Sequence, residues 1–134
     1  MNNIIVTSGK RKQAIAKAMI KEGMGKITIR KKDYKLLQFF DRLRMEEPIK
    51  IYEQVIGKLN FDADITAMGG GEKSQVEAAR LALAKGMVKF SGSKELSRAF
   101  LAYDRNLLVA DVRRKEAYKP GDSKARRHRQ TSYR

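Results

Sequence analysis

The sequence contains no cysteine and a single histidine among its 134 residues, and these shortages exclude several kinds of site. Without cysteine the chain has no disulfide, no thiolate metal site and no cysteine nucleophile. The one histidine, His128, lies among arginines, which disfavour its protonation and leave it without the fixed geometry of a catalytic base. We therefore expect no catalytic residue and no cofactor, and we expect that the protein is not an enzyme.

Clusters of acidic residues are equally scarce. Asp62 and Asp64 lie two residues apart on one face of an expected strand, where two carboxylates could in principle bind Mg²⁺. The sequence offers no third ligand for them, so a solvated face of a sheet is the favoured interpretation. We expect no metal site.

Long apolar segments are absent as well. No run approaches the roughly 18 to 20 apolar residues that a membrane-spanning helix needs. The opening residues MNNIIVTSGKRK place their charge after a short apolar run, which is the reverse of the order in a signal peptide. We expect a cytoplasmic protein without a membrane partner, and the lack of cysteine agrees with a reducing compartment.

Positive charge is what the sequence has in excess. Thirty Lys and Arg oppose fifteen Asp and Glu, so the formal net charge is +15. Residues 1–37 carry +8, residues 38–111 hold eleven charges of each sign, and residues 112–134 carry +7. A general solubility role would spread this charge more evenly, whereas two basic ends attract polyanions. Nucleic acid is the favoured partner, because the C-terminal segment has no amphipathic apolar face for a membrane surface.

The distribution of apolar residues sets the domain boundary. Hydrophobic residues make up 42% of the chain, which is enough for one globular body, and we assign residues 1–111 to one globular domain. From Arg113 onward only two alanines and two tyrosines offer apolar surface. Their burial cannot offset the entropy lost when the backbone is fixed. We expect residues 112–134 to form an extended basic tail that is disordered when free and ordered by an external polyanion.

Alternating apolar and polar residues predict strands in the N-terminal half. Segments 3–7 and 13–21 have the pattern of strands, although an alanine-rich helix stays open for 13–21. Segment 26–30 is expected to pair with 13–21 as a hairpin across a turn at 22–25. Asp33 is expected to cap a short helix that ends at Phe39 or Phe40.

The remaining segments predict three further helices and one strand. Residues 46–56 predict a helix with Pro48 early in it and Gly57 after its end. Residues 62–68 alternate like a strand and stop at three glycines, after which Ser74 is expected to cap a helix that reaches Phe90. That helix is apolar on two sides, so we expect it between a sheet and another helix. Residues 94–103 predict a last helix, and the core is expected to end within 107–114.

The glycines at 69–71 carry the first functional hypothesis. A strand, a glycine loop and a helix N-terminus together make an anion site, because free N–H groups and the helix dipole converge there. An RNA phosphate site helped by Lys73 and Arg80, a simple tight turn and an ATP site all stay open. The nucleotide-binding pattern G-x-x-x-x-G-K-[ST] is not met, because Glu72 separates Gly71 from Lys73 and Ser74.

Basic residues at both ends carry the second hypothesis. The triplet at residues 10–12 follows Gly9, and the tail is rich in arginine, whose fork matches phosphate geometry and stacks on bases. Pro120 and Gly121 interrupt the tail, which suggests a defined path. Tyr133 and Arg134 place a stacking ring and a guanidinium at the tip.

Three motifs together resemble one known family. They are G-K-R-K-x-A-x-A at residues 9–16, G-G-G-x-x-x-Q-x-x-A-x-R at residues 69–80, and the ending ARRHRQTSYR. The chain is similar from Ile4 to Arg134 to the family of the universal ninth protein of the small ribosomal subunit. The Ser-Tyr-Arg ending and the lack of an N-terminal extension look archaeal, since bacterial members typically end in Ser-Lys-Arg.

The resemblance implies a fold, a place and partners. The fold would be α+β, a two-layer α/β sandwich with a left-handed βαβ crossover, like the second domain of the fifth small-subunit protein. The protein would bind small-subunit rRNA in the head beside neighbouring head proteins, and its tail would reach the anticodon stem-loop of the P-site tRNA. The candidate rRNA-binding residues are Lys10, Arg11, Lys12, Gly69, Gly70, Gly71, Lys73, Arg80, Arg113, Arg114, Lys124, Arg126, Arg127 and Arg129, and the candidate tRNA-binding residues are Tyr133 and Arg134.

Two other functions stay open at this point. A free-standing nucleic-acid-binding regulator would explain the charge equally well. A small-molecule kinase would use the glycine loop for phosphate, although the sequence offers no base for it and we expect no small-molecule substrate. The structural ribosomal protein, bound to the ribosome in the cytoplasm, is the favoured hypothesis.

Overall fold

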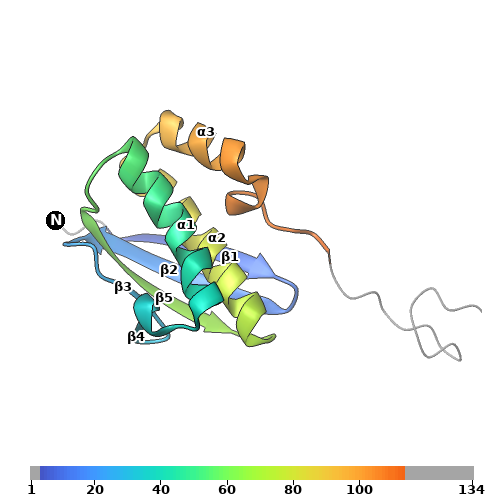
Figure 1. Cartoon of the computed structure of the whole chain (residues 1–134). Coiled ribbons are helices and arrows are strands. Elements are labelled where there is room, and N and C mark those ends of the chain that lie inside the picture. Colours follow the sequence, from blue (N-terminus) through green and yellow to red (C-terminus); the bar gives the residue numbers. More distant parts are fainter. Residues whose placement is uncertain (1–3, 114–134) are drawn as a thin grey trace, which may run out of the picture.

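The computed structural model describes residues 4–113 (Figure 1). The predictions on Arg114, Lys124, Arg126, Arg127, Arg129, Tyr133 and Arg134 lie outside these residues. The strands are β1 (Ile5–Arg11), β2 (Ala14–Glu22), β3 (Ile27–Ile29), β4 (Lys32–Asp33) and β5 (Phe61–Met68). The helices are α1 (Phe39–Val55), α2 (Glu72–Ser91) and α3 (Lys94–Tyr103), with 3₁₀ turns η1 (Tyr34–Leu36) and η2 (Arg105–Leu107).

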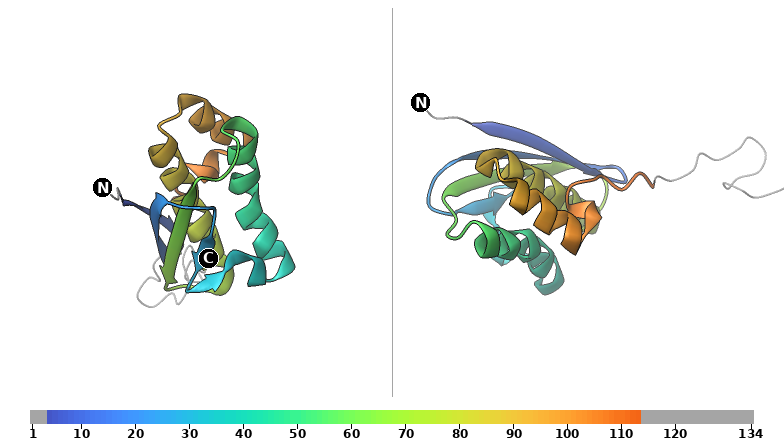
Figure 2. Two further views of the ribbon diagram at one scale, coloured as in Figure 1. Left: turned by 90° about the vertical axis from the view of Figure 1, so that its left-hand side faces the viewer. Right: turned by 90° about the horizontal axis from the view of Figure 1, so that it is seen from above.

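The strands form one mixed sheet in the order β1-β2-β5-β3-β4. Only β3 and β5 run parallel, and α1 lies in the chain between them, so these three elements form a βαβ unit. The three helices lie on one side of the sheet (Figure 2). The fold is α+β and agrees with the predicted two-layer sandwich, while the hand of the βαβ crossover stays a prediction.

Alternation explains the two central strands. In β2 the inward residues Ala14, Ala16, Ala18 and Ile20 are fully buried, and the residues between them are exposed. This period of two is that of a strand, because side chains point to opposite faces in turn. The helix alternative for this segment is therefore wrong, and the strand predicted at 62–68 is confirmed as β5.

The predicted hairpin between segments 13–21 and 26–30 is wrong. Strand β5 lies between β2 and β3, and the partner of β2 on its other side is β1, across the turn Lys12–Gln13. The connection from β2 to β3 is held by Asp62, whose Oδ1 accepts N–H bonds from Met24, Gly25 and Lys26 at 2.9–3.1 Å. An alternating pattern shows which face of a strand is buried but not which strand lies beside it.

The helix boundaries differ from the predictions in three places. Asp33 does act as an N-cap, but of the 3₁₀ turn η1. Helix α1 starts at Phe39 rather than at residue 46, so Pro48 lies in its interior instead of its first turn. Helix α2 starts one residue after its N-cap Gly71, and Ser74 lies inside it. Helix α3 has the predicted bounds, with the Ser93 Oγ accepting a hydrogen bond from the Leu96 N–H.

Helix α2 lies unusually close to the sheet. A Cβ added at Gly9 of β1 would lie 2.2 Å from the Ala78 carbonyl oxygen, and one at Gly86 would lie 2.1 Å from the Ile20 Cδ1. The Thr7 hydroxyl donates a 2.7 Å hydrogen bond to the Ala82 carbonyl across the same contact. Small residues on both elements permit this approach, which fixes the start of α2 relative to the β1–β2 turn.

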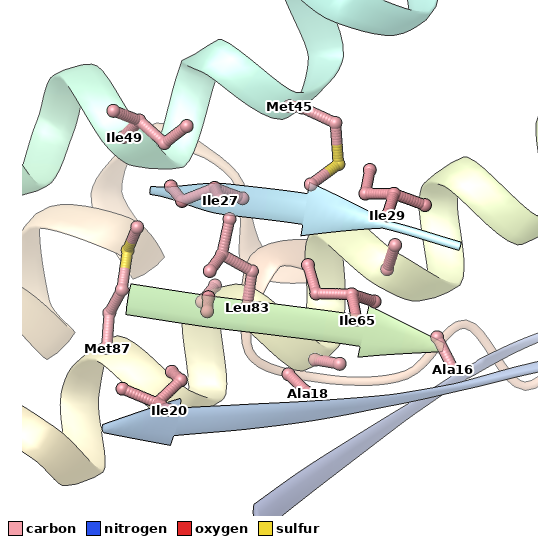
Figure 3. Packing of buried hydrophobic residues seen from close by; sticks show 14 of the residues in the cluster. Ala16, Ala18, Ile20, Ile27, Ile29, Met45, Ile49, Ile65, Leu83 and Met87 are labelled. Atoms are coloured by element: carbon pink, nitrogen blue, oxygen red, sulfur yellow. The ribbon is translucent and has the colours of Figure 1, made fainter. Parts of the chain in front are cut away.

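The core fills the space between the sheet and the helices (Figure 3). Ile27 and Ile29 of β3 lie under Met45 and Ile49 of α1 in the same apolar cluster. On α2, Val76, Ala79, Leu83 and Met87 are buried, and so is Leu81 on another side of the helix. The predicted position of this helix between the sheet and another helix is confirmed.

Candidate nucleic-acid interface

Three turns of the chain lie at one edge of the sheet. The β1–β2 turn follows the pair Arg11–Ala14, and β5 ends with Met68 beside Ile15, next to that turn. Strand β3 runs parallel to β5 and reaches the same edge, where the β3–β4 turn follows it. We call residues 11–13, 30–31 and 69–71 the glycine-loop edge. It brings together segments that are up to about 60 residues apart in the sequence.

The glycines of this edge are required by its geometry. Gly69 and Gly70 have φ of 77° and 59°, in the left-handed region that favours glycine. A Cβ on Gly69 would lie 2.6 Å from the Gln13 carbonyl oxygen, so the loop touches the β1–β2 turn. Gly71 is the N-cap of α2 and has open space at its Cβ position, and no side chain among residues 4–113 caps this helix end. The loop therefore presents the helix N-terminus to solvent, as an anion site needs.

A hollow at this edge collects residues that the sequence singled out separately. Arg11 and Lys12 of the β1–β2 turn, Gly70 and Gly71 of the loop, and Arg113 line it, together with Gln13 and Ser74. Lys12 has φ of 53°, so a bulky cation occupies a left-handed position at the tip of the turn. Cations from two distant parts of the chain, the β1–β2 turn and residue 113, thus lie beside the start of α2.

The other two lysines of the prediction lie around this hollow without lining it. Lys10 is exposed on β1, next to Arg11, with its side chain on the open face of the sheet. Lys73 lies in the first turn of α2 and lines a separate hollow with Phe40 and Arg44. Both lysines lie at the same end of the molecule as the glycine-loop edge, so positive charge is present on more than one side of this edge.

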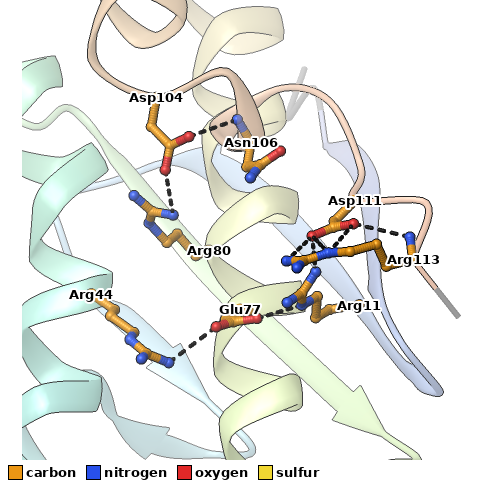
Figure 4. Close-up of polar contacts among 8 residues, drawn as sticks. All are labelled: Arg11, Arg44, Glu77, Arg80, Asp104, Asn106, Asp111 and Arg113. Atoms are coloured by element: carbon orange, nitrogen blue, oxygen red, sulfur yellow. Dashed lines mark hydrogen bonds and ion pairs between the residues drawn. The ribbon is translucent and has the colours of Figure 1, made fainter. Parts of the chain in front are cut away.

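Carboxylates engage Arg11 and Arg113 (Figure 4). The Arg11 Nε lies 2.7 Å from Glu77 of α2, and its Nη1 contacts the Asp111 carboxylate. The Arg113 side chain donates to the Asp111 Oδ2, at 2.9 Å from Nε and 2.7 Å from Nη2. Its backbone N–H donates to the Oδ1 at 2.9 Å, and its Nε lies 3.1 Å from the same oxygen. Arg44 of α1 approaches Glu77 at 3.2 Å. This network, the Asp111 clasp, joins the last described residues to β1 and α2.

The clasp changes the ionisation of its members. Hydrogen bonds from the Arg113 side chain and backbone, followed by the Arg11 contact, hold the pKa of the Asp111 carboxyl well below its ordinary value. The same carboxylate raises the pKa of Arg113. Asp111 is therefore charged at any pH near neutrality. The Arg113 side chain is still 76% exposed, so a phosphate can approach it.

Arg80, unlike the other predicted rRNA-binding cations in the described residues, lies between the helices. Its side chain is only 13% exposed and contacts Glu47 of α1 through Nη2 and Asp104 at 3.5 Å through Nη1. It lies about two and a half turns of α2 beyond Gly71 and joins α2 to Glu47 of α1 and to Asp104 after α3. A phosphate at Arg80 would have to compete with both carboxylates.

The sequence interpretation missed the β3–β4 turn. Arg30 and Lys31 are exposed there with φ of 50° and 65°. The Arg30 Nη1 donates to the Gln75 Oε1 at 2.9 Å, and the Gln75 Nε2 donates to the Gly69 carbonyl at 3.0 Å. The run Arg-Lys-Lys at residues 30–32 was a visible signal of charge, but it is not a turn sequence.

The acidic pair on β5 has a structural role. Asp62 accepts three backbone N–H bonds, of which the one from Lys26 does most to lower the pKa of its carboxyl. The Thr28 hydroxyl donates to Asp64 at 3.2 Å. Among residues 4–113 no group of three or more His, Cys, Asp or Glu could hold a metal ion. No helix in that range is long and apolar enough to cross a membrane.

Comparison with known proteins agrees with this arrangement. A family model for ribosomal protein S9/S16 matches residues 9–134, from β1 through the glycine-loop edge to the C-terminal residue. The chain belongs to this family. As a member of a family of ribosomal proteins it is a structural protein rather than an enzyme, which removes the kinase hypothesis.

Three similar proteins come from archaea and match over nearly their whole length. The small ribosomal subunit protein uS9 of Methanococcus vannielii is 43% identical over 134 residues, which is 98% of each chain. Proteins of the same name from Methanococcus maripaludis strain C7 and Methanothrix thermoacetophila are 45% and 40% identical over 134 and 132 residues, again 98% of each chain. The archaeal character expected from the Ser-Tyr-Arg ending is thereby supported.

Proposed function

We propose that this protein is a structural constituent of the small ribosomal subunit that binds rRNA in the head through the glycine-loop edge and the tail. Its tip, Arg134 with Tyr133 beside it, reaches the anticodon stem-loop of the P-site tRNA. Neighbouring head proteins complete its surroundings, and it acts on the ribosome in the cytoplasm. No small-molecule substrate and no cofactor take part.

One observation supports the proposal most strongly. Lys12, the glycine loop with the open start of α2, and Arg113 line one hollow, although the sequence separates them widely. Free N–H groups at a helix N-terminus, surrounded by cations, are suited to a phosphate group. Arg113 also belongs to the predicted tail of residues 112–134, so the first residues of that segment lie beside this hollow.

The same geometry indicates which of the proposed cations can contact phosphate most readily. Lys10, Lys12 and Lys73 are the lysines best placed to contact phosphate, and Arg113 can do so through its exposed side. Arg11 and Arg80 belong to the proposal as well, but carboxylates contact both of them. We expect their phosphate contacts to contribute less to affinity than those of the lysines.

The tail residues Arg114, Lys124, Arg126, Arg127 and Arg129 extend the proposed contact along rRNA. Each cation that meets a phosphate releases a condensed counterion, so the affinity should fall steeply with salt. A tail reaches farther than a small domain can, because extended residues span about 3.3 Å each. This reach is the physical reason for adding a tail to a compact body.

The first test is a deletion of residues 130–134 from the full protein. We expect assembly into small subunits to stay nearly intact and the dissociation of P-site tRNA to accelerate, because only the tip contacts tRNA in the proposal. The measurement is the tRNA off-rate from reconstituted subunits, with the deletion compared with Arg134→Ala. Unchanged off-rates in both would refute the role of the tip while leaving the rRNA contact untouched.

The second test addresses the body. Changing Lys10 and Lys12 together to Ala should weaken binding to small-subunit rRNA and reduce the slope of log K against log salt by about 1 to 2. A matched variant, Arg11→Ala, should change that slope less, since carboxylates already contact Arg11. Equal slopes for the wild type and the double variant would remove the β1–β2 turn from the contact.

A further inference from the structure

All non-glycine residues with positive φ in the described range are cations. They are Lys12, Arg30 and Lys31, with φ of 53°, 50° and 65°. Lys12 is in the β1–β2 turn, and Arg30 and Lys31 are the two central residues of the β3–β4 turn, between the paired residues Ile29 and Lys32. A hairpin turn with two positive φ values favours Asn-Gly or Gly-Gly, because a Cβ is unfavourable in this conformation. Arg-Lys is therefore a costly choice of residues for the β3–β4 turn.

The protein uses glycine where a turn needs only conformational freedom. Gly25, Gly57 and Gly92 all have positive φ, and each lies in a connection at the other end of the sheet or of α2. Where a chain keeps a non-glycine residue in an unfavourable backbone conformation, we infer that the side chain of that residue is needed. What Arg30 and Lys31 supply in place of glycine is positive charge.

The β3–β4 turn is tied to the glycine loop. The backbone N–H of Arg30 donates to the Ile65 carbonyl of β5 at 2.8 Å. Its guanidinium donates to Gln75, which donates in turn to the Gly69 carbonyl. The turn is thus held on the side of the loop opposite to Lys12, since β5 lies between β2 and β3 in the sheet.

The charge around the turn is one-sided. Arg30, Lys31, Lys32 and Lys35 are exposed, and Asp33 is the only acidic residue in this stretch. The Asp33 carboxylate accepts the Lys35 backbone N–H as the cap of η1. Within residues 4–113, the ion pairs of Arg11, Arg44 and Arg80 have no counterpart at these four cations, and the Arg30 guanidinium donates to a neutral amide, that of Gln75.

We propose that Arg30 and Lys31 form a second phosphate-binding turn, which contacts an RNA backbone on the far side of the glycine loop from Lys12. This inference rests on the proposed rRNA binding and adds a site that the family motifs do not contain. The two basic turns then hold RNA phosphates on both sides of the open start of α2. Gln75 keeps the second turn at the correct distance from the loop.

The test is the double variant Arg30→Asn and Lys31→Gly in the full chain. It removes both charges and installs the residues that the backbone conformation favours. We expect its thermal midpoint to equal or exceed that of the wild type, while its affinity for full-length small-subunit rRNA falls roughly tenfold. The slope of log K against log salt should decrease in magnitude by about 1 to 2.

The matched control is Lys89→Gln with Lys94→Gln. These exposed lysines lie at the end of α2 and the start of α3, away from the glycine loop. The control variant loses two positive charges, the same number as the turn variant. We expect its affinity to change less than about twofold. A loss as large as that of the turn variant would assign the effect to net charge and overturn the proposed site.

Two further outcomes separate the possible failures. If the turn variant binds naked rRNA like the wild type but assembles poorly into subunits, the turn contacts a protein and the RNA site is refuted. If the wild type itself shows no salt-dependent binding to small-subunit rRNA, the proposed function fails rather than this inference. A higher thermal midpoint with weaker RNA binding is the result that supports the inference, because a purely structural turn cannot give opposite signs.

Discussion

The turns at the two ends of the sheet both contain residues with positive φ, but the residue types at these positions differ. At the opposite edge, positive φ values fall on glycines, at Gly25 after β2 and at Gly57 before β5. At the glycine-loop edge, Gly69 and Gly70 share that conformation with Lys12, Arg30 and Lys31. The comparison teaches that one end is built for stability and the other also for charge. A fold can carry such a cost where its close-packed layers fix the turns.

The largest expected effect comes from adding a methyl group at each end. Gly69→Ala should destabilise the protein by about 1–3 kcal/mol more than Gly57→Ala, because its Cβ would also lie 2.6 Å from the Gln13 carbonyl oxygen. Gly57 has nothing within 4 Å of a Cβ, so only its φ of 116° opposes alanine. Urea unfolding measures both free energies. Equal losses would show that the contact between the loop and the β1–β2 turn is dispensable.

A reciprocal exchange tests the comparison directly. Lys12→Gly should leave the free energy of unfolding unchanged or raise it by up to about 1 kcal/mol, since glycine tolerates φ of 53°. Its rRNA affinity should fall, and the salt slope should decrease in magnitude by about 1. Unfolding curves and filter binding on one sample supply the two readouts.

The control for this exchange is Gly25→Lys at the opposite edge. It adds a cation at φ of 101°, where the Cβ would lie 3.2 Å from the Leu59 Cβ. We expect a loss of stability without a gain in rRNA affinity, because the charge is at the wrong end. A gain equal to the loss in Lys12→Gly would mean that the position of a cation does not matter.

The smallest effect should be a pH dependence at the opposite edge. Three backbone N–H groups lower the pKa of Asp62 in the folded state, so its carboxylate stabilises the fold above its ordinary pKa of about 3.8 and loses that effect as pH falls through the lower folded value. Asp62→Asn should therefore be less stable than the wild type at pH 7, and the difference should shrink below about pH 4. A difference that stays constant from pH 7 to pH 2.5 would contradict this cause.

Much of the fold could be predicted from local patterns. The alternation around Ala16 and Ala18 favours the strand β2, and the segment 94–103 predicts α3 with its bounds. The strand beside β3 could not be predicted, since alternating apolar residues do not show which strands pair. Pro48 suggested a helix start, because proline is rare inside helices, yet packing of α1 on the core overrides this preference.

The candidate site was predictable in its parts and not in its arrangement. The glycines and the cations at residues 10–12 stand out in the sequence, because their composition is unusual. The carboxylates that contact Arg11 come from Glu77 and Asp111, far along the chain, so only the tertiary structure reveals them. Arg30 and Lys31 were missed because Arg-Lys is not a turn signal, and the cost of their conformation is visible only in the backbone angles.

The Asp111 clasp can raise the effective concentration of the tail near RNA that the body has already bound. Since Asp111 binds both Arg11 of the body and Arg113, Arg113 is held at a fixed point beside the hollow. In the proposed function, body and tail are two linked ligands of RNA, so docking of the first would confine the search of the second to a small volume. Avidity gained in this way needs no new bond to RNA. The Asp111 carboxylate would thus set how efficiently the two halves of the protein bind RNA together.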